Sequence, residues 1–498
     1  MDRNRRLVCL LVLMSFCMTA LVKSDCSDTS KSGNCTTGPK KISVWYKMKA
    51  QSGNQGNDVN FVTEMEESCN ELPLKVEVQT KLQTGSEFIF PGSGITQGSD
   101  YSYSPYGGVV YMYKYTPDGT IQFIVPKNKS GVAVFSGGSA WDGVTQINET
   151  SVDVRYRVWC RCNLPTPAFE SNWTDINVVD KKYLEISHGL GITPDMVIVQ
   201  LRHGSTNWVS DIMGAMSTSE TGRKKSGVIY GYNSRTVRIW APNNGSLFHF
   251  TEGWESSHDK YMVLSGQVKV YVWTYLMNIK SKSIPLNRRP SGSDLEFRLP
   301  VSFDISQDML HFTISPTDGE NGGFYFSGMG SVQNADPTNQ YGGVMYSYST
   351  DKIRLWHPNL DGRHFLVYVN SKWGGGNHIQ SSESVVAKVS VWKAGQICLI
   401  PKSKRTTPNP TTTQSTTAMT SRKRGQLTSL NPSTGTGNPS YQYTKKNESW
   451  YERSVAVPVL WLVVGGGCLL LFILISAAVT CLCKRNSDKI IPLNDEET

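Results

Sequence analysis

Two short stretches of the chain place an arginine and a tryptophan on the same side of a predicted strand. The stretches read VRIW and IRLW, and they contain Arg238 with Trp240 and Arg354 with Trp356. Successive side chains of a β-strand point to opposite faces, so each arginine shares a face with its tryptophan, away from the aliphatic residues. A cation beside a large aromatic ring is a surface on which a sugar ring or a partner's side chain can stack.

We expect these four residues to form the centre of a ligand-binding surface. The structural alternative is that the arginine and tryptophan stack on each other, or that the tryptophan packs beneath a neighbouring loop or domain. Gln122 and Ile124 occupy the corresponding positions of an earlier, looser copy of the same pattern. Binding is therefore predicted mainly in residues 163–395.

The sequence contains no recognisable catalytic or metal-binding motif. It lacks HExxH, GxSxG, a phosphate-binding glycine loop and paired CxxC sequences, and none of its eight histidines has a partner at metal-ligand spacing. The segment DGENGG could hold calcium through Asp318, Glu320 and Asn321, but it has no counterpart in the other repeats. We therefore expect no enzymatic activity, no metal and no cofactor.

The arginine and tryptophan pairs belong to a repeated hairpin, Gly-Val-x-Tyr-x-Tyr followed by a second strand and a proline. The closing prolines, Pro126, Pro242 and Pro358, are 116 residues apart. Two tryptophans follow each proline at similar distances; they are Trp141 and Trp159, Trp254 and Trp273, and Trp373 and Trp392. Equal spacing of this kind indicates an internal repeat.

Each repeat begins and ends with a run typical of a strand. The closing runs VDVRYRVW, QVKVYVW and VAKVSVW alternate apolar and polar residues with period two, and glycine-rich turns separate the runs. The sequence predicts an all-β fold of three tandem β-sandwich-like modules, at residues 25–162, 163–280 and 281–398.

The two ends of the chain predict a membrane protein. Residues 1–24 combine arginines with a short apolar run, as in a secretory signal peptide. Residues 399–453 are rich in Ser, Thr and Pro and predict a disordered stalk. Residues 454–483 predict one transmembrane helix, and basic residues open the cytoplasmic tail, 484–498, which indicates type I topology.

The net charge of +9 does not indicate nucleic-acid binding. Residues 25–400 carry 34 basic and 34 acidic side chains, so the excess positive charge lies in the signal peptide and the stalk. We expect the partners to be an extracellular protein or glycan and the membrane.

Cysteines and glycosylation sequons support an extracellular location. The candidates for disulfide bonds are Cys26, Cys35, Cys69, Cys160, Cys162 and Cys398. The candidates for N-glycosylation are Asn34, Asn128, Asn148, Asn172, Asn244 and Asn447. Five cysteines precede residue 163 and cannot all pair among themselves, so one stays reduced, reaches Cys398, or leaves Cys398 to link a homodimer; we favour the homodimer.

These features predict a single-pass type I glycoprotein of the cell membrane. We expect it to act as a non-enzymatic adhesion or recognition receptor through its repeated extracellular modules. Two alternatives stay open: a lectin-like carbohydrate-binding protein, and a structural glycoprotein that is shed or incorporated into the extracellular matrix.

Overall fold

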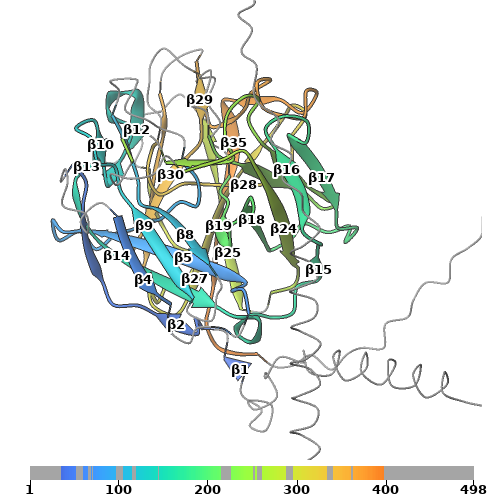
Figure 1. Ribbon diagram of the computed structural model, residues 1–498. Helices are drawn as coiled ribbons and strands as arrows, with labels where there is room; N and C mark the ends of the chain where they lie inside the picture. Colours follow the sequence, from blue (N-terminus) through green and yellow to red (C-terminus); the bar gives the residue numbers. More distant parts are fainter. Residues whose placement is uncertain are drawn as a thin grey trace, which may run out of the picture. The chain divides into compact units, whose positions relative to one another are not determined.

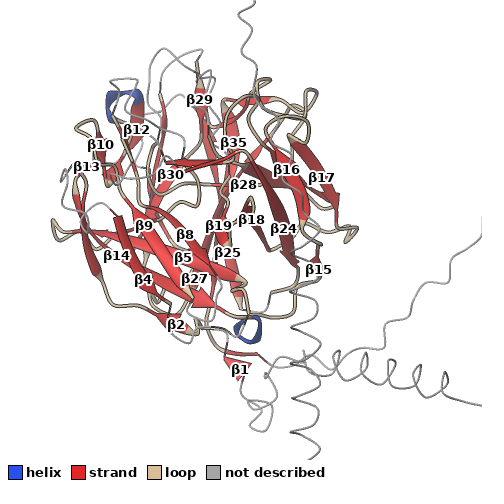
Figure 2. Cartoon of the chain, in the orientation of Figure 1, coloured by secondary structure: helices blue, strands red, loops and turns tan. Residues whose placement is uncertain are grey.

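The part of the chain that the computed structural model describes is built almost entirely of strands (Figures 1 and 2). The structure describes residues 35–397 except 37, 52–59, 66–68, 70, 97–104, 115–118, 144, 215–225, 251–252, 255–260, 277, 288–294, 334–339 and 360–362. Within these residues the only helical elements are two 3₁₀ turns, η4 (Gly138–Ala140) and η5 (Arg161–Asn163). The predicted all-β class is confirmed.

The strands divide into three groups that follow the sequence repeat, and we call these groups units 1, 2 and 3. Unit 1 contains β2 (Lys41–Ile42), β3 (Tyr46–Lys49), β4 (Asn60–Glu64), β5 (Lys75–Leu82), β6 (Ile89–Pro91), β7 (Tyr106–Gly107), β8 (Val110–Lys114), β9 (Thr120–Ile124), β10 (Gly131–Val132), β11 (Val134–Phe135), β12 (Trp141–Gly143), β13 (Asn148–Glu149) and β14 (Ser151–Trp159). Unit 2 contains β15 (Phe169–Glu170), β16 (Thr174–Asn177), β17 (Tyr183–Ser187), β18 (Met196–His203), β19 (Trp208–Asp211), β20 (Ile229–Tyr232), β21 (Thr236–Trp240), β22 (Phe248–Phe250), β23 (Tyr261–Val263) and β24 (Ser265–Trp273). Unit 3 contains β25 (Ile279–Asn287), β26 (Glu296–Arg298), β27 (Met309–Pro316), β28 (Phe326–Ser327), β29 (Tyr341–Gly342), β30 (Met345–Tyr348), β31 (Lys352–Pro358), β32 (His364–Phe365), β33 (Val367–Val369), β34 (Gln380–Ser382) and β35 (Ser384–Trp392).

Each unit uses the same antiparallel pairings. The closing strand pairs with the opening strand, as β14 with β5, β24 with β18 and β35 with β27. The repeated hairpins are β8–β9, β20–β21 and β30–β31, and a further strand, β4, β17 or β26, pairs with the outer strand of each hairpin. The sequence repeat is therefore a repeat of strand topology.

The hairpin of each unit also forms a backbone β-pairing with a residue of another unit. Tyr113 of β8 lies opposite Val209 of unit 2, and Tyr232 of β20 lies opposite Tyr325 of unit 3. Tyr348 of β30 lies opposite Ile89 of unit 1, which completes a cycle. These pairings cross the predicted module boundaries: units 1 and 2 share one sheet, units 3 and 1 share another, and an isolated bridge joins unit 2 to unit 3.

The two faces of each hairpin are buried in different hydrophobic cores. In unit 2, Val237 and Ile239 belong to the core that their own unit forms, whereas Trp240 belongs to the core of unit 3. In unit 3, Leu355 is part of the unit's own core and Trp356 is part of the core of unit 1. Each hairpin therefore stabilises two cores at once.

Three glycines make backbone-to-backbone contacts between units. A Cβ atom on Gly94 would lie 1.9 Å from the carbonyl oxygen of Asp211, and one on Gly214 would lie 2.0 Å from that of Ser327. A Cβ atom on Gly330 would lie 2.0 Å from the carbonyl oxygen of Pro91 in unit 1. The contacts follow the same cycle as the hairpins, and only glycine allows so close an approach.

The three closing tryptophans of the repeats meet in a fourth cluster. Trp159, Trp273 and Trp392 lie there with Met196 and Met309, which begin β18 and β27. Because all three units contribute, this cluster joins them at the point where the closing strands end and the opening strands begin.

The two ends of the described chain lie side by side. β1 (Cys35–Thr36) pairs antiparallel with β36 (Gln396–Ile397), and Figure 1 shows β1 at one end of the strand-rich body. A disulfide joins Cys69 to Cys160 across 91 residues, a loop length for which chain entropy alone contributes about 4–5 kcal/mol. In this pairing Cys35 lies opposite Ile397, the residue that precedes Cys398 in the sequence.

Several predicted features lie outside the described residues. They are the signal peptide, the stalk, the transmembrane helix, the tail, Cys26, Cys398, Asn34 and Asn447. Within the described residues, no helix has the length and apolar character needed to span a bilayer.

We predict that alanine at each of the three contact glycines destabilises the whole cycle. Gly94→Ala, Gly214→Ala and Gly330→Ala should each lower the free energy of unfolding by about 1–3 kcal/mol or more, because the facing atoms are backbone and cannot rotate away. Urea unfolding followed by tryptophan fluorescence measures the change. Gly376→Ala is the control, since a Cβ atom there meets nothing within 4 Å; equal effects of all four variants would contradict the prediction.

His203, which is fully buried, and His311, which is partly exposed, make the stability of the fold depend on pH. Burial lowers the pKa of His203 to about 3, and burial with the charges of Lys75 and Lys388 lowers the pKa of His311 to about 3. In an unfolded chain the pKa of histidine is about 6.5. Below that pH the unfolded chain binds more protons than the folded chain, so stability is lost as the pH falls from about 6.5 towards 3.

When the pH falls from ~7 to ~5, we predict that the titration of each histidine reduces the free energy of unfolding by about 2 kcal/mol. His203→Gln and His311→Gln should each flatten the pH dependence, because glutamine does not titrate. Urea unfolding at a series of pH values measures the slope. A slope that both variants retain would show that these side chains do not cause it.

Candidate functional site

The predicted binding surface of arginine and tryptophan is not exposed. Trp240 and Trp356 have exposed fractions of 0%. The strand alternation is as predicted, but the face that carries each tryptophan is covered by the next unit in the cycle. The prediction that these rings form an open stacking surface is therefore wrong, and the structural alternative holds for both tryptophans.

Each tryptophan packs against aromatic rings of the unit that covers it. The ring of Trp240 lies 6.0 Å from that of Phe326 in unit 3 and 5.9 Å from that of Tyr183 in its own unit. The ring of Trp356 lies 6.1 Å from that of Phe90 in unit 1, and its Nε1 donates a hydrogen bond to the carbonyl oxygen of Thr145.

The two arginines stack on aromatic rings of the next unit. The guanidinium of Arg238 lies 4.3 Å from the ring centroid of Phe324, and that of Arg354 lies 3.8 Å from the ring centroid of Phe88. In unit 1, where the arginine is replaced by Gln122, Lys114 lies 5.2 Å from the ring of Trp208. A cation over an aromatic ring thus occurs at all three junctions, with the cation on either strand of the hairpin.

The second tyrosine of each repeated hairpin forms a hydrogen bond across the same junction. The hydroxyl of Tyr113 donates to Oδ1 of Asp211 at 2.6 Å, and that of Tyr348 donates to Oε1 of Glu77 at 3.0 Å. The hydroxyl of Tyr232 lies 3.3 Å from Nε2 of His311. The second tyrosine of the Gly-Val-x-Tyr-x-Tyr pattern therefore contacts the next unit at each junction.

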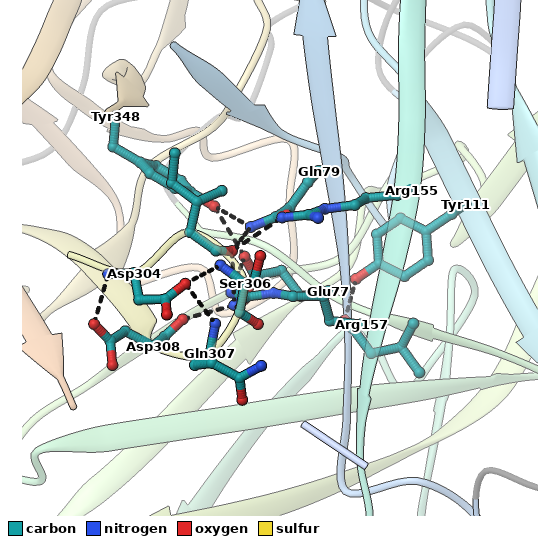
Figure 3. A network of polar contacts seen from close by, with 12 residues as sticks. Glu77, Gln79, Tyr111, Arg155, Arg157, Asp304, Ser306, Gln307, Asp308 and Tyr348 are labelled. Carbon is teal, nitrogen blue, oxygen red and sulfur yellow. Dashed lines mark hydrogen bonds and ion pairs between the residues drawn. The ribbon is translucent and has the colours of Figure 1, made fainter. Parts of the chain in front are cut away.

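The junction between units 3 and 1 contains a network of polar contacts (Figure 3). Arg157 of β14 is fully buried and donates hydrogen bonds to the carbonyl oxygens of Ile305, Ser306 and Asp308. It also forms an ion pair with Glu77 at 2.8 Å. Because this pair is buried and its hydrogen bonds point inward, the network holds the segment before β27 against unit 1 and presents no open site.

A cleft of about 880 Å³ lies on unit 3, among the loops around β33 and β34. Its charged lining residues are Asp318, Glu320, Arg363 and Lys372, and all four are exposed. The cleft is thus lined by two acids and two bases, with amide and hydroxyl groups between them.

The loop from Pro316 to Phe326 forms one wall of the cleft, and unit 2 fixes its position. Nη1 of Arg238 donates to the carbonyl oxygen of Glu320 at 2.9 Å and to Oδ1 of Asn321 at 3.0 Å. The backbone N–H of Asn321 donates to Oε1 of Gln380 at 3.0 Å. A residue predicted to touch ligand thus positions the wall of a cleft instead.

Asn321 is not placed as a calcium ligand. Its side chain is fully buried, its Oδ1 accepts the hydrogen bond from Arg238, and its Nδ2 donates to the carbonyl oxygen of His378. Among the residues that the structure describes, no three histidine, cysteine or acidic side chains gather where they could hold a metal ion.

A hydrogen-bonded group of polar side chains lines another part of the cleft. The hydroxyl of Tyr368 donates to Oε1 of Gln340 at 2.8 Å and accepts from Nδ2 of Asn370 at 2.7 Å. Burial raises the pKa of Tyr368 to about 12, so this hydroxyl stays protonated at neutral pH. Sequence reasoning missed these residues, and no motif in the sequence indicates them.

The described sequons lie on the surface. Asn148, Asn172 and Asn244 are exposed and Asn128 is partly exposed, so their side chains are accessible for modification. None of the four lines the cleft.

We predict that Trp240→Ala and Trp356→Ala each lower the free energy of unfolding by about 3–5 kcal/mol, because each leaves a cavity between two units. Tyr275→Ala, at a ring that is 76% exposed, should cost about 1 kcal/mol or less. Thermal and urea unfolding give the comparison. If Trp240→Ala and Trp356→Ala are as stable as the wild type, the packing role given to these two tryptophans is contradicted.

No family model, curated protein or solved structure matches this chain. The interpretation of the site therefore rests on its geometry and on the chemistry of its residues.

Proposed function

We propose that the chain is a single-pass type I glycoprotein of the cell surface that acts as a non-enzymatic recognition or adhesion receptor. In this proposal three β-sandwich-like units form the extracellular part, and the Ser/Thr/Pro-rich segment 399–453 is the stalk that precedes the membrane helix at 454–483. The apolar segments of the sequence, the Cys69–Cys160 disulfide and the accessible sequons support it.

The cleft on unit 3 is the observation that carries the proposal of recognition. The repeated tyrosines, arginines and tryptophans are occupied in holding the units together, and the cleft is lined by residues that differ from those of the other units. The loop between β27 and β28 runs from Pro316 to Phe326, whereas β18 and β19 are joined between His203 and Trp208. A loop extended on a rigid scaffold is where binding residues are usually found.

The adhesion of cells that display the full-length chain tests this proposal. Ser381 is exposed in the cleft lining, so Ser381→Trp should obstruct the cleft and abolish adhesion to cells that bear the ligand. Ser384→Trp is the matched control, because Ser384 is exposed but is not part of the lining. Adhesion that survives Ser381→Trp at equal surface expression would exclude the cleft as the recognition site.

A further inference from the structure

We propose that the cleft on unit 3 binds a glycan without net charge. This inference rests on the proposed function, since it names the ligand of the same cleft. It follows from the balance of charge in the lining, from the rigidity of the walls and from the limited apolar surface.

The charges of the cleft favour a neutral ligand. Asp318 and Glu320 belong to the β27–β28 loop, whereas Arg363 and Lys372 belong to the segments that flank β32 and β33. Because the two carboxylates and the two bases balance, the lining as a whole offers no net attraction to a sialylated or sulfated glycan or to a cationic peptide. Carboxylate, guanidinium and ammonium groups all form strong hydrogen bonds with hydroxyl groups, which a sugar presents around its ring.

The walls of the cleft are fixed before a ligand arrives. Nε2 of Gln380 donates to the carbonyl oxygen of Asp318 at 3.1 Å, while Oε1 accepts from the backbone of Asn321, so one side chain of β34 holds the loop wall at two points. Gly319, which follows Asp318 in the same loop, has a φ of +78°. A Cβ atom on this residue would lie 2.7 Å from the side-chain amide of Gln380. Prearranged polar groups lose little conformational entropy on binding, which favours recognition of small hydroxyl-bearing rings.

The apolar part of the lining is small and open. Ile379 is 46% exposed, whereas Val369 is 1% exposed and adds little surface. One exposed aliphatic side chain is enough to contact the C–H face of a pyranose ring. A peptide that binds through an anchor side chain needs a buried apolar pocket, and the described lining does not provide one.

Direct binding of neutral sugars to the full chain tests the inference. The protein is purified in a detergent without a sugar headgroup, because glycosidic detergents would compete. The probes are albumin conjugates carrying galactose, glucose, mannose or N-acetylglucosamine, with a sialyllactose conjugate and heparin as charged comparisons. We expect at least one neutral conjugate to bind and the two charged probes to bind more weakly.

Matched variants locate the binding. Glu320→Gln and Ile379→Ser should each weaken binding of the neutral conjugate about tenfold, because one removes a charged hydrogen-bond acceptor and the other removes the apolar contact. Glu87→Gln is the control: it makes the same charge change in the corresponding loop of unit 1, where Glu87 is exposed and lies outside the cleft. It should bind as the wild type does.

Three results would overturn the inference. They are no binding of any neutral conjugate, stronger binding of the charged probes, and equal binding by all three variants. If adhesion remains sensitive to Ser381→Trp but is unaffected when glycosidases strip the partner cells, the ligand is a protein. The inference would then fail while the proposed function stands. If adhesion is affected neither by Ser381→Trp nor by the glycosidases, both the inference and the proposed function are rejected.

Discussion

The burial of each hairpin between two hydrophobic cores is the constraint on which the described fold depends. A unit that stood alone would expose the outer face of its hairpin, including a tryptophan in units 2 and 3. Fully burying a side chain of that size contributes about 2–5 kcal/mol, so each unit is stabilised by the neighbour that covers it. Because the hairpin of unit 3 packs against unit 1, the hairpin of every unit is covered by another unit.

The period-two pattern was enough to predict the strands and their repeat, but not what covers each face. Alternation separates Ile239 from Trp240 and says that they point in opposite directions. It does not say whether the second face meets water or another core. The relevant signal was that Ile124, Trp240 and Trp356 are all apolar at one position, which is unusual for a surface. Instead, the arginine beside each tryptophan suggested an exposed site, whereas it lies at the edge of the junction and stacks on Phe324 or Phe88.

The cleft could not be predicted because its residues are separated in the sequence and share no motif. Asp318 and Arg363 come from two loops and Gln380 from strand β34, and they meet only because the strands of unit 3 bring these segments together. Calcium binding by Asp318 and Glu320, which the sequence analysis did not favour, would need Asn321 to point the same way. Asn321 is buried instead, because its amide is needed to hold the loop.

Arg238 shows how the shared junctions and the cleft depend on each other. Its guanidinium stacks on Phe324 and donates to both the backbone and the side chain of the loop that forms the cleft wall. Unit 2 therefore supports the shape of a site that lies wholly on unit 3. A substitution at Arg238 would disturb that wall without removing any group from the lining, so weakened binding in such a variant would not show contact with ligand. Only residues that line the cleft and leave the junction intact, such as Glu320 or Ile379, can separate recognition from the packing that supports it.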